Sequence, residues 1–451
     1  MIGIESNTCK PSAISPSLVI IMGSIYCPLL FMRMNFKVIK TLLMLFAIVH
    51  ADLFASKIPE PGPSVMRLPV LIENEKSELR VAEGFEIKTL VDGLDSPRWP
   101  VVLPNGNILV SGSKTEALPN MPEETIRLLT SMNIFGKSPN TIIEIDMNQN
   151  PPEVRNLIQG LNQPFGMLFK NQSLFVANTD SIVKYPFKDF MLSGAAEKII
   201  DLPFGPPNNH WTRNIILNER GDKILIAVGS GTNVNAEGVD EKDRAAVWEI
   251  NLDGSEKRIY ASGLRNPVGL DFYTENGSLW TTVNERDGIG EFTPPDYLTE
   301  VKEGAFYGWP YVYFKDYADP TQIELNPEKV KRAMRTSLMP DLPLDAHSVP
   351  LGLLFHSGKN ISSKYKNGAF VVRRGGVSTS KLTGYDVLFI PFMNGKPTGT
   401  IQTFVSGFIA SEERGEIHGR PVGIAEGVNG EIFITDDVGG RVLVVTSKLE
   451  N

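Results

Sequence analysis

One sequence unit recurs six times between Gly93 and Thr435, and it constrains the fold more than any other feature of the chain. Each unit has a Gly-Leu or similar turn, a short apolar run, a turn of the Asn-Gly or Gly-Asp kind, and a second β-rich run. Asn-Gly between apolar runs predicts a hairpin, because both residues tolerate positive φ. The second runs lie at 108–111, 174–177, 224–228, 279–283, 370–372 and 432–435.

Further apolar runs follow most of the predicted hairpins, while long helical periodicity is almost absent. We expect these additional strands at 141–146, 182–185, 246–252, 384–392 and 441–446. A four-stranded unit that recurs six times predicts an all-β fold, a six-bladed β-propeller. Two unrelated β-sandwiches are the alternative, and the regular spacing of one unit argues against them. The segment 291–343 is expected to be a loop excursion between the fourth and fifth blades.

The first 55 residues differ in character from the rest and predict an upstream segment followed by a secretory signal peptide that starts at Met34. A basic stretch at 34–40 precedes an apolar run at 41–49 and small residues at 50–55, which is the layout of a signal peptide. We therefore expect a periplasmic or secreted protein. Membrane anchoring is expected only if the segment is retained; its other apolar run, 18–31, is shorter than the roughly 20 residues of a spanning helix.

The remaining chain is expected to consist of an extended lead-in at 56–80 and the propeller at 81–451. Both cysteines, Cys9 and Cys27, precede it, so the predicted mature chain has no disulfide and no cysteine metal site. An exported protein of that kind fits a bacterial periplasm. Residues 51–451 carry 40 basic and 51 acidic side chains, a net charge of −11, without a basic run. This composition argues against a nucleic-acid partner.

The segment 263–310 holds a strand with chemically informative residues at both ends. Arg265 and Asn266 precede the strand, and the acidic, glycine-broken loop 284–288 follows it. A guanidinium pairs with carboxylates and loop oxygens suit divalent cations, so this arrangement predicts an acidic small molecule beside a cation. The first turns of all units should meet at one end of a propeller. We therefore expect His210, His347 and Arg420 around the same funnel.

The string Gly-Leu-Arg-Asn-Pro-Val-Gly-Leu at 263–270 and the Tyr-Gly-Trp-Pro at 307–310 resemble the soluble quinoprotein glucose/sorbosone dehydrogenase family. The resemblance extends from about Val81 to Thr446 and is closest to sorbosone-type and aldose sugar dehydrogenases. It implies pyrroloquinoline quinone (PQQ) and Ca²⁺ as cofactors, a small-molecule sugar or sugar aldehyde as substrate, and an external electron acceptor.

The same resemblance implies roles for individual residues. His210 would be the base that removes the hydroxyl proton while hydride moves to PQQ, although a surface-loop histidine bonded to backbone is the simpler reading of the residue alone. Arg265 would stabilise the charge that develops, and Arg265 with Asn266 would contact PQQ. Arg420 would pair with a PQQ carboxylate. The loop Glu285, Arg286 and Asp287 would hold calcium, in part through backbone carbonyls.

Two positions keep features of the family pattern, and two others depart from it. Arg374 stands where relatives have lysine or histidine, so a cation is kept, and His347 lies in an Ala-His-x-x-Pro-Leu-Gly string expected near the cofactor. Val422 replaces a second arginine, and Val-Ser-Thr at 377–379 replaces Trp-Asn-Arg. These changes leave two other hypotheses open: a calcium-dependent lactonase-type hydrolase and a non-catalytic ligand-binding propeller.

Two further pairs of residues are expected to stabilise the fold and not to take part in chemistry. Tyr307 and Trp309 are expected to be packing residues, and Asp436 with Asp437 to make turn hydrogen bonds.

Overall fold

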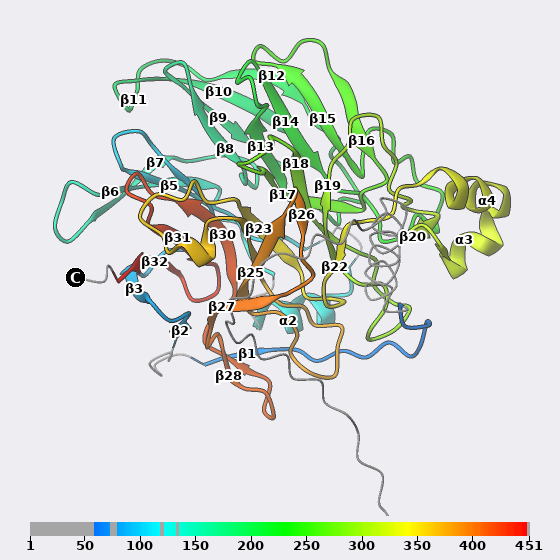
Figure 1. Cartoon of the computed structure of the whole chain (residues 1–451). Helices are drawn as coiled ribbons and strands as arrows, with labels where there is room; N and C mark the ends of the chain where they lie inside the picture. Colours follow the sequence, from blue (N-terminus) through cyan, green and yellow to red (C-terminus); the bar gives the residue numbers. More distant parts are fainter. Residues whose placement is uncertain (1–57, 73–78, 118–120, 132–134, 449–451) are drawn as a thin grey trace, which may run out of the picture. The chain divides into compact units, whose positions relative to one another are not determined.

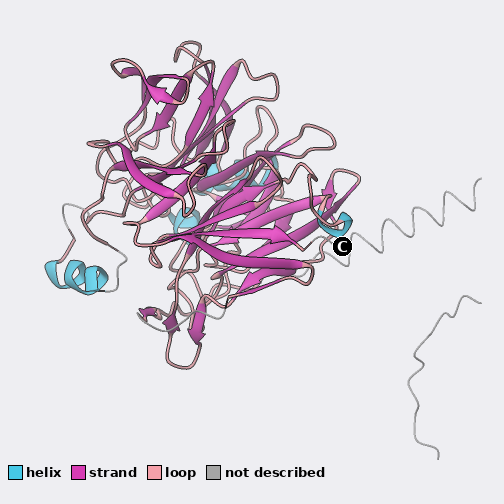
Figure 2. Cartoon of the chain, turned by 90° about the vertical axis from the view of Figure 1, so that its left-hand side faces the viewer, coloured by secondary structure: helices cyan, strands magenta, loops and turns pink. Residues whose placement is uncertain are grey.

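The computed structural model describes residues 58–72, 79–117, 121–131 and 135–448. The predicted signal peptide lies outside the described residues. Strands make up most of the regular structure and helices are few (Figure 2), which confirms a mainly β protein. No helix in the described ranges is long and apolar enough to span a bilayer.

Six antiparallel sheets with four main strands each follow one another along the chain (Figure 1). The first three are β4 (Pro97–Val102), β5 (Ile108–Gly112), β6 (Thr141–Asp146) and β7 (Glu153–Ile158); β8 (Met167–Lys170), β9 (Ser173–Ala177), β10 (Ser181–Lys188) and β12 (Glu197–Asp201); and β13 (Arg213–Leu217), β14 (Lys223–Val228), β15 (Ala246–Asn251) and β16 (Arg258–Ser262). The fourth and fifth are β17 (Asn266–Phe272), β18 (Leu279–Asn284), β19 (Tyr297–Glu300) and β22 (Leu342–Pro343); and β23 (Pro350–Leu354), β24 (Gly368–Arg373), β25 (Asp386–Met393) and β27 (Gln402–Ser406).

The sixth sheet joins the two ends of the described chain. It contains β30 (Pro421–Glu426), β31 (Ile432–Asp436), β32 (Arg441–Ser447) and β3 (Phe85–Val91). The early strand β3 pairs with the last strand β32, from Phe85 opposite Ser447 to Val91 opposite Val442. This pairing ties residues more than three hundred positions apart into one sheet. The strands predicted at 141–146, 246–252 and 441–446 appear as β6, β15 and β32, within one residue at each end.

The shorter elements lie between or beside these sheets. They are β1 (Val70–Leu71), β2 (Arg80–Val81), β11 (Met191–Leu192), β20 (Val312–Tyr313), β21 (Tyr317–Ala318), β26 (Lys396–Pro397), β28 (Ile409–Ser411), β29 (Glu416–Ile417), α2 (Glu123–Ser131), α3 (Pro320–Leu325), α4 (Pro327–Thr336) and the 3-10 turn η1 (Ser363–Tyr365).

The predicted excursion 291–343 is placed differently from the prediction. It does not connect the fourth and fifth sheets, because its two ends are themselves strands of the fourth sheet: Tyr297 pairs with Pro343 and Leu298 with Leu342. Between β19 and β22 the chain forms the β20–β21 hairpin and the helices α3 and α4 (Figure 1). Asp319 caps α3 by accepting hydrogen bonds from the backbone of Thr321 and Gln322.

The first strands of consecutive sheets contact one another, and β30 of the sixth sheet contacts β4 of the first. Glycines permit this close approach. A Cβ on Gly269 would lie 2.5 Å from the Leu351 oxygen, and one on Gly423 would lie 2.5 Å from the Arg98 oxygen. Both distances are shorter than real Cβ contacts, so these first strands can pack together only with glycine at such positions.

Apolar clusters fill the space between neighbouring sheets. The sheets in sequence order share such clusters, and Ile108, Val110 and Ile145 of the first sheet pack with Phe433 and Val442 of the sixth. A separate cluster takes one residue from each sheet, either in its first strand or two residues before that strand: Trp99, Phe165, Trp211, Val268, Leu351 and Val422. We call these six residues the central cluster. Burying a side chain of this size stabilises the fold by roughly 1.5–3 kcal/mol.

The lead-in at 58–72 lies against loops of the later sheets. The Gly62 nitrogen donates to the Ile289 oxygen and the Arg67 nitrogen to the Val377 oxygen, both at 2.8 Å. Strand β1 then pairs in parallel with β29. The lead-in is therefore part of the packed unit.

Candidate active site

We call the central cluster the floor of the site. In each unit, the residue immediately before the cluster residue in sequence lies at the edge of this floor. Four of these positions are prolines, at 164, 267, 350 and 421. The other two are Arg98 in the first unit and His210 in the third. The Arg98 guanidinium lies over the rings of Trp211 and Phe165, 5.4 Å and 5.6 Å from their centroids. The turn ahead of each first strand thus brings its side chain to a common region.

His210 is held so that one ring nitrogen is free to accept a proton. Its Nδ1 lies 2.9 Å from both the oxygen and the Oγ of Ser230, and that Oγ donates to the Thr232 oxygen. Nδ1 must therefore carry the hydrogen, which leaves a lone pair on Nε2. Burial, and next the charge of Arg265, lower the pKa of His210 to about 3, so the imidazole is neutral at physiological pH.

We expect this low pKa to make the protein less stable in acid. The unfolded chain binds a proton at His210 near pH 6.5, whereas the folded chain does not until about pH 3. Between these values His210 should reduce the free energy of unfolding by about 1.4 kcal/mol per pH unit as the pH falls. Urea unfolding at pH 6.5 and 4.5 measures the change, and His210→Gln, which cannot titrate, should show the shallower dependence. Equal slopes for the two proteins would contradict a neutral His210 in the folded protein.

Arg265 joins two loops of the site through its guanidinium. Its Nε donates to the Asn233 oxygen at 3.0 Å and Nη2 to the Asn233 Oδ1 at 2.8 Å. Its Nη1 donates to the oxygens of Asn284 and Glu285 at 3.1 Å and 2.6 Å, and Asp287 lies 3.4 Å from Nη2. Arg265 is buried, and it fixes the 232–235 and 284–287 loops relative to His210. Its predicted contact with a ligand stays a prediction.

His347 is a fixed cation rather than a second base. Its Nδ1 lies 3.0 Å from the Asp287 Oδ1 and its Nε2 lies 2.9 Å from the Gly290 oxygen. Because both neighbours only accept hydrogen bonds, both ring nitrogens are protonated. Burial lowers the pKa of His347, but the hydrogen bond and charge of Asp287 outweigh it and raise that pKa overall. His347 holds a positive φ of 59°, a conformation that is uncommon for non-glycine residues.

Two arginines pair with the carboxylate of Asp437, and a third arginine lies beside them. Arg98 Nη1 donates to Asp437 Oδ2, and Arg374 Nε donates to the same oxygen at 2.7 Å. Arg420 donates to the backbone oxygens of Gly375 and Arg374 and lies over the Tyr385 ring. We call Arg98, Arg374, Arg420 and Asp437 the arginine cluster. Burial, and then the charges of Arg374 and Arg98, set the pKa of Asp437, which is lowered overall. The cluster therefore carries an excess of positive charge.

Several buried polar atoms near these groups have no hydrogen-bond partner among the described residues: Asn266 Oδ1, Asn284 Oδ1, Asp437 Oδ1 and Arg98 Nε. Unsatisfied buried groups are rare and mark places where water, an ion or a ligand is expected. A multiply charged carboxylate ligand suits the three guanidinium groups, and a cation suits the amide oxygens. The donor set thus fits the implied cofactor and Ca²⁺.

The predicted metal loop is held from both sides. Arg286 points into the excursion, where its Nε pairs with Asp319 and its Nη2 donates to Thr321 Oγ1 at 2.8 Å. Its Nη1 donates to the Asp287 oxygen at 2.9 Å. The described residues contain no group of three or more His, Cys, Asp or Glu side chains placed to hold a metal. Any cation here would therefore depend on loop carbonyls, amide oxygens and ligand atoms.

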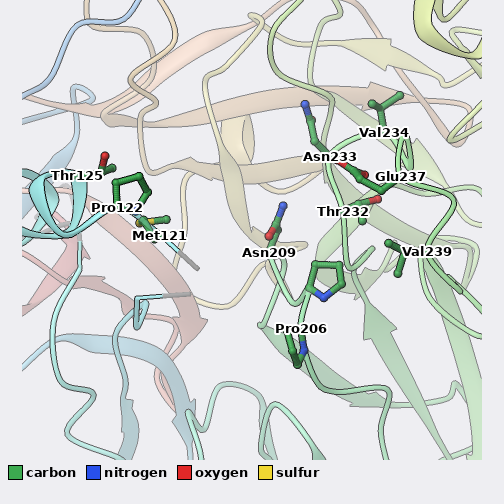
Figure 3. A pocket seen from close by; sticks show the side chains of 11 residues that line it. Met121, Pro122, Thr125, Pro206, Asn209, Thr232, Asn233, Val234, Glu237 and Val239 are labelled. Atoms are coloured by element: carbon green, nitrogen blue, oxygen red, sulfur yellow. The ribbon is translucent and has the colours of Figure 1, made fainter. Parts of the chain in front are cut away.

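Two cavities open beside the His210 turn. The larger, about 800 Å³, is lined by Met121, Pro122, Thr125, Pro206, Pro207, Asn209, Thr232, Asn233, Val234, Glu237 and Val239 (Figure 3). The smaller, about 450 Å³, is lined by Thr115, Glu116, Ala117, Met121, Phe135, Asn162, Gln163, Phe204, Gly205, Pro206, Asn208, Asn209 and Trp211. They share Met121, Pro206 and Asn209, so ligand space extends from the His210 turn in two directions.

Three residues of the site were missed by sequence reasoning. Arg98 occupies the position of His210 in another unit, and aligning the six units would have revealed it. Asp437 was expected to make turn bonds like Asp436, which does accept from the Arg420 and Gly439 nitrogens; Asp437 instead pairs with Arg98 and Arg374. Asn233 carries no sequence signal. The packing of Tyr307 and Trp309 is confirmed, since both are buried.

The two departures from the family pattern have definite places. Val422 belongs to the central cluster, so an apolar residue there completes the floor. In the 377–379 segment, the Ser378 Oγ lies 3.3 Å from the Asp287 Oδ1, and the Val377 oxygen accepts from the lead-in.

Comparisons with known proteins agree with this architecture. The chain is 25% identical over 394 residues to an uncharacterized protein of Borreliella burgdorferi, which covers 84% of this chain and 93% of that protein. A calcium structure of the Trichoderma reesei carbohydrate-active enzyme family AA12 superposes with a TM-score of 0.67 at 16% identity, over 83% of this chain and 98% of that one.

The holo form of the pyranose dehydrogenase PQQ domain from Coprinopsis cinerea superposes with a TM-score of 0.64 at 17% identity, over 83% of this chain and 98% of that one. Residues 79–313 and 315–448 match the model of the TrAA12-like family. The resemblance to quinoprotein sugar dehydrogenases is confirmed at the level of the family, and the chain belongs to the TrAA12-like family.

Proposed function

We propose that the six sheets are the blades of a six-bladed β-propeller. The contacts between consecutive first strands, the return from β30 to β4, and the apolar cluster between the sixth and first sheets support this arrangement. The pairing of β3 with β32 within the last sheet also supports it, because it links the start of the propeller to its end.

We further propose that the protein binds PQQ with Ca²⁺ and oxidises an aldose sugar or a sugar aldehyde of the sorbosone type. The observation that carries this proposal is the arginine cluster, in which the buried Arg98 and the partly buried Arg374 pair with Asp437 and the buried Arg420 lies beside them, on the same floor as a neutral histidine. Bound PQQ would supply the acceptor for the hydride. The names of the structural relatives, a pyranose dehydrogenase PQQ domain and a calcium structure of family AA12, support the same assignment.

Different residues of the site would bind the ligand, accept the proton and stabilise negative charge. Arg374 and Arg420, together with Arg98, would bind ligand carboxylates, because a planar guanidinium matches a carboxylate with two hydrogen bonds. His210 would take the hydroxyl proton at Nε2, and Ser230 holds the ring in the tautomer that makes this possible. Arg265 and the His347 cation would favour negative charge that develops nearby.

Asn266 and the loop 285–287 would complete the cofactor and calcium contacts. The unpartnered Asn266 Oδ1 is available for this purpose. An external acceptor would remove the electrons. We also propose that the protein is exported to the periplasm or outside the cell, and that it attaches to the membrane if the N-terminal segment is retained.

Reconstitution is the direct test. We expect purified apo-protein to take up PQQ in the presence of Ca²⁺, with quinone absorbance retained after gel filtration, and then to reduce a dye when an aldose is added. Omission of Ca²⁺ should weaken retention of the quinone. Absence of quinone binding would remove the proposal; quinone binding without turnover would favour a binding propeller, and lactone hydrolysis without quinone would favour the hydrolase.

A further inference from the structure

The two cavities beside His210 offer more space than one sugar ring needs. Ligand pockets of about 300–1,000 Å³ hold drug-sized molecules, and the larger cavity alone measures about 800 Å³. Both cavities reach the His210 turn, because Asn209 lines both and Trp211 lines the smaller one. The larger one also reaches Arg265 through Asn233.

The smaller cavity combines aromatic and amide side chains. Phe204 and Phe135 contribute rings, and Asn162 and Gln163 contribute amides. Phe204 is 55% exposed, which leaves much of an aromatic ring uncovered at a cavity wall. A sugar ring has apolar C–H faces and a rim of hydroxyl groups. An aromatic side chain covers such a face, while amides bond the hydroxyl groups.

Some of the amides in the walls have free hydrogen-bonding capacity. Within the described residues, the Asn209 side chain has no hydrogen-bond partner, and Figure 3 places it between the Met121–Pro122 side and the Thr232–Asn233 side of the larger cavity. Gln163 donates from Nε2 to the Lys114 oxygen at 2.9 Å, and its Oε1 remains available. Asn208, in contrast, is occupied by Arg213, Arg244 and Thr179. Asn209 and Gln163 can therefore bond a ligand.

We propose that the substrate is an oligosaccharide oxidised at its reducing end, and that the cavity at Phe204 binds a sugar unit attached to the reacting one. This inference rests on the proposed sugar oxidation, since it takes the reacting unit to lie at His210. Phe204 covers one face of the additional unit, and Gln163 and Asn209 bond its hydroxyl groups. The larger cavity, with mainly proline and aliphatic walls, leaves room for the rest of the chain.

Binding to the apo-protein tests the subsite without any turnover. The probes are borohydride-reduced α- and β-linked gluco-, galacto- and manno-oligosaccharides, which carry no oxidisable reducing end, and calorimetry measures their dissociation constants. At least one probe should bind more tightly than the matching reduced monosaccharide. Phe204→Ala should weaken that probe about tenfold, a loss of about 1.4 kcal/mol. Phe292→Ala is the control, since Phe292 is 65% exposed and lines neither cavity.

Failure of all probes to bind, or equal affinity for wild type and Phe204→Ala, would overturn the inference. Kinetics of the reconstituted enzyme then separate it from the proposed function. Phe204→Ala should lower kcat/KM for the oligosaccharide and leave kcat/KM for the monosaccharide unchanged. Oxidation of both sugars with no effect of Phe204→Ala would refute only the subsite. Phe204-dependent binding without oxidation would refute the dehydrogenase and the role of the oligosaccharide as its substrate, and would leave only a sugar-binding cavity at Phe204.

Discussion

Replacing His210 with alanine should reduce kcat for sugar oxidation by about 10²–10⁴-fold, the usual contribution of a general base. The reason is geometric: Nδ1 is committed to Ser230, and burial keeps the Nε2 lone pair unprotonated. PQQ retention should change little, because no hydrogen bond or ion pair among the described residues joins His210 to the arginine cluster. Stopped-flow dye reduction with a saturating aldose measures the loss.

His356→Gln is a matched control for this variant. His356 is buried, whereas His210 is half-buried. The Nε2 of His356 lies 3.1 Å from the Gly430 oxygen and its Nδ1 accepts from the Gly358 nitrogen, contacts of a connecting loop. The His356→Gln variant should leave kcat unchanged. Unaltered turnover in His210→Ala would show that His210 is a structural loop residue, the simpler reading of its sequence.

Asp437→Asn should destabilise the apo-protein by about 3–5 kcal/mol, the cost of leaving buried charge without its partner. Asparagine keeps the shape and an acceptor oxygen but removes the carboxylate that pairs with both Arg98 and Arg374. Urea unfolding at neutral pH measures the difference. If the cluster binds an acidic ligand, PQQ should raise the melting temperature of this variant more than that of wild type, because its carboxylates restore the missing negative charge.

Asp345→Asn provides the control for that experiment. Asp345 also pairs with an arginine, Arg373, at 2.5 Å, but its side chain is 66% exposed. Exposed ion pairs contribute about 0–1 kcal/mol, so this variant should unfold almost as wild type does. Equal stability of Asp437→Asn and wild type would mean that the three guanidinium groups do not depend on the carboxylate.

Local features of the fold were readable from the sequence because neighbouring residues produce them. Strands such as β6 and β32 follow from short apolar runs, and the hairpin turns follow from Asn and Gly, whose backbones accept positive φ. The excursion was assigned to the wrong place for the opposite reason. Strand β22 has only two residues, and its pairing with β19 bridges more than forty residues, so no local pattern marks it.

The sequence by itself determined the repeat, the mainly β architecture and the candidate residues His210, Arg265, His347, Arg374 and Arg420, since each stands in a recognisable turn. Only the tertiary structure decided which charges meet. The contact between Arg98 and Asp437 joins positions 339 residues apart, and it exists because the sixth sheet packs against the first. The pKa shifts were decided in the same way: burial and then Arg265 lower the pKa of His210, and Asp287 raises the pKa of His347. Arg265 and Asp287 are both far along the chain from the histidines that they act on.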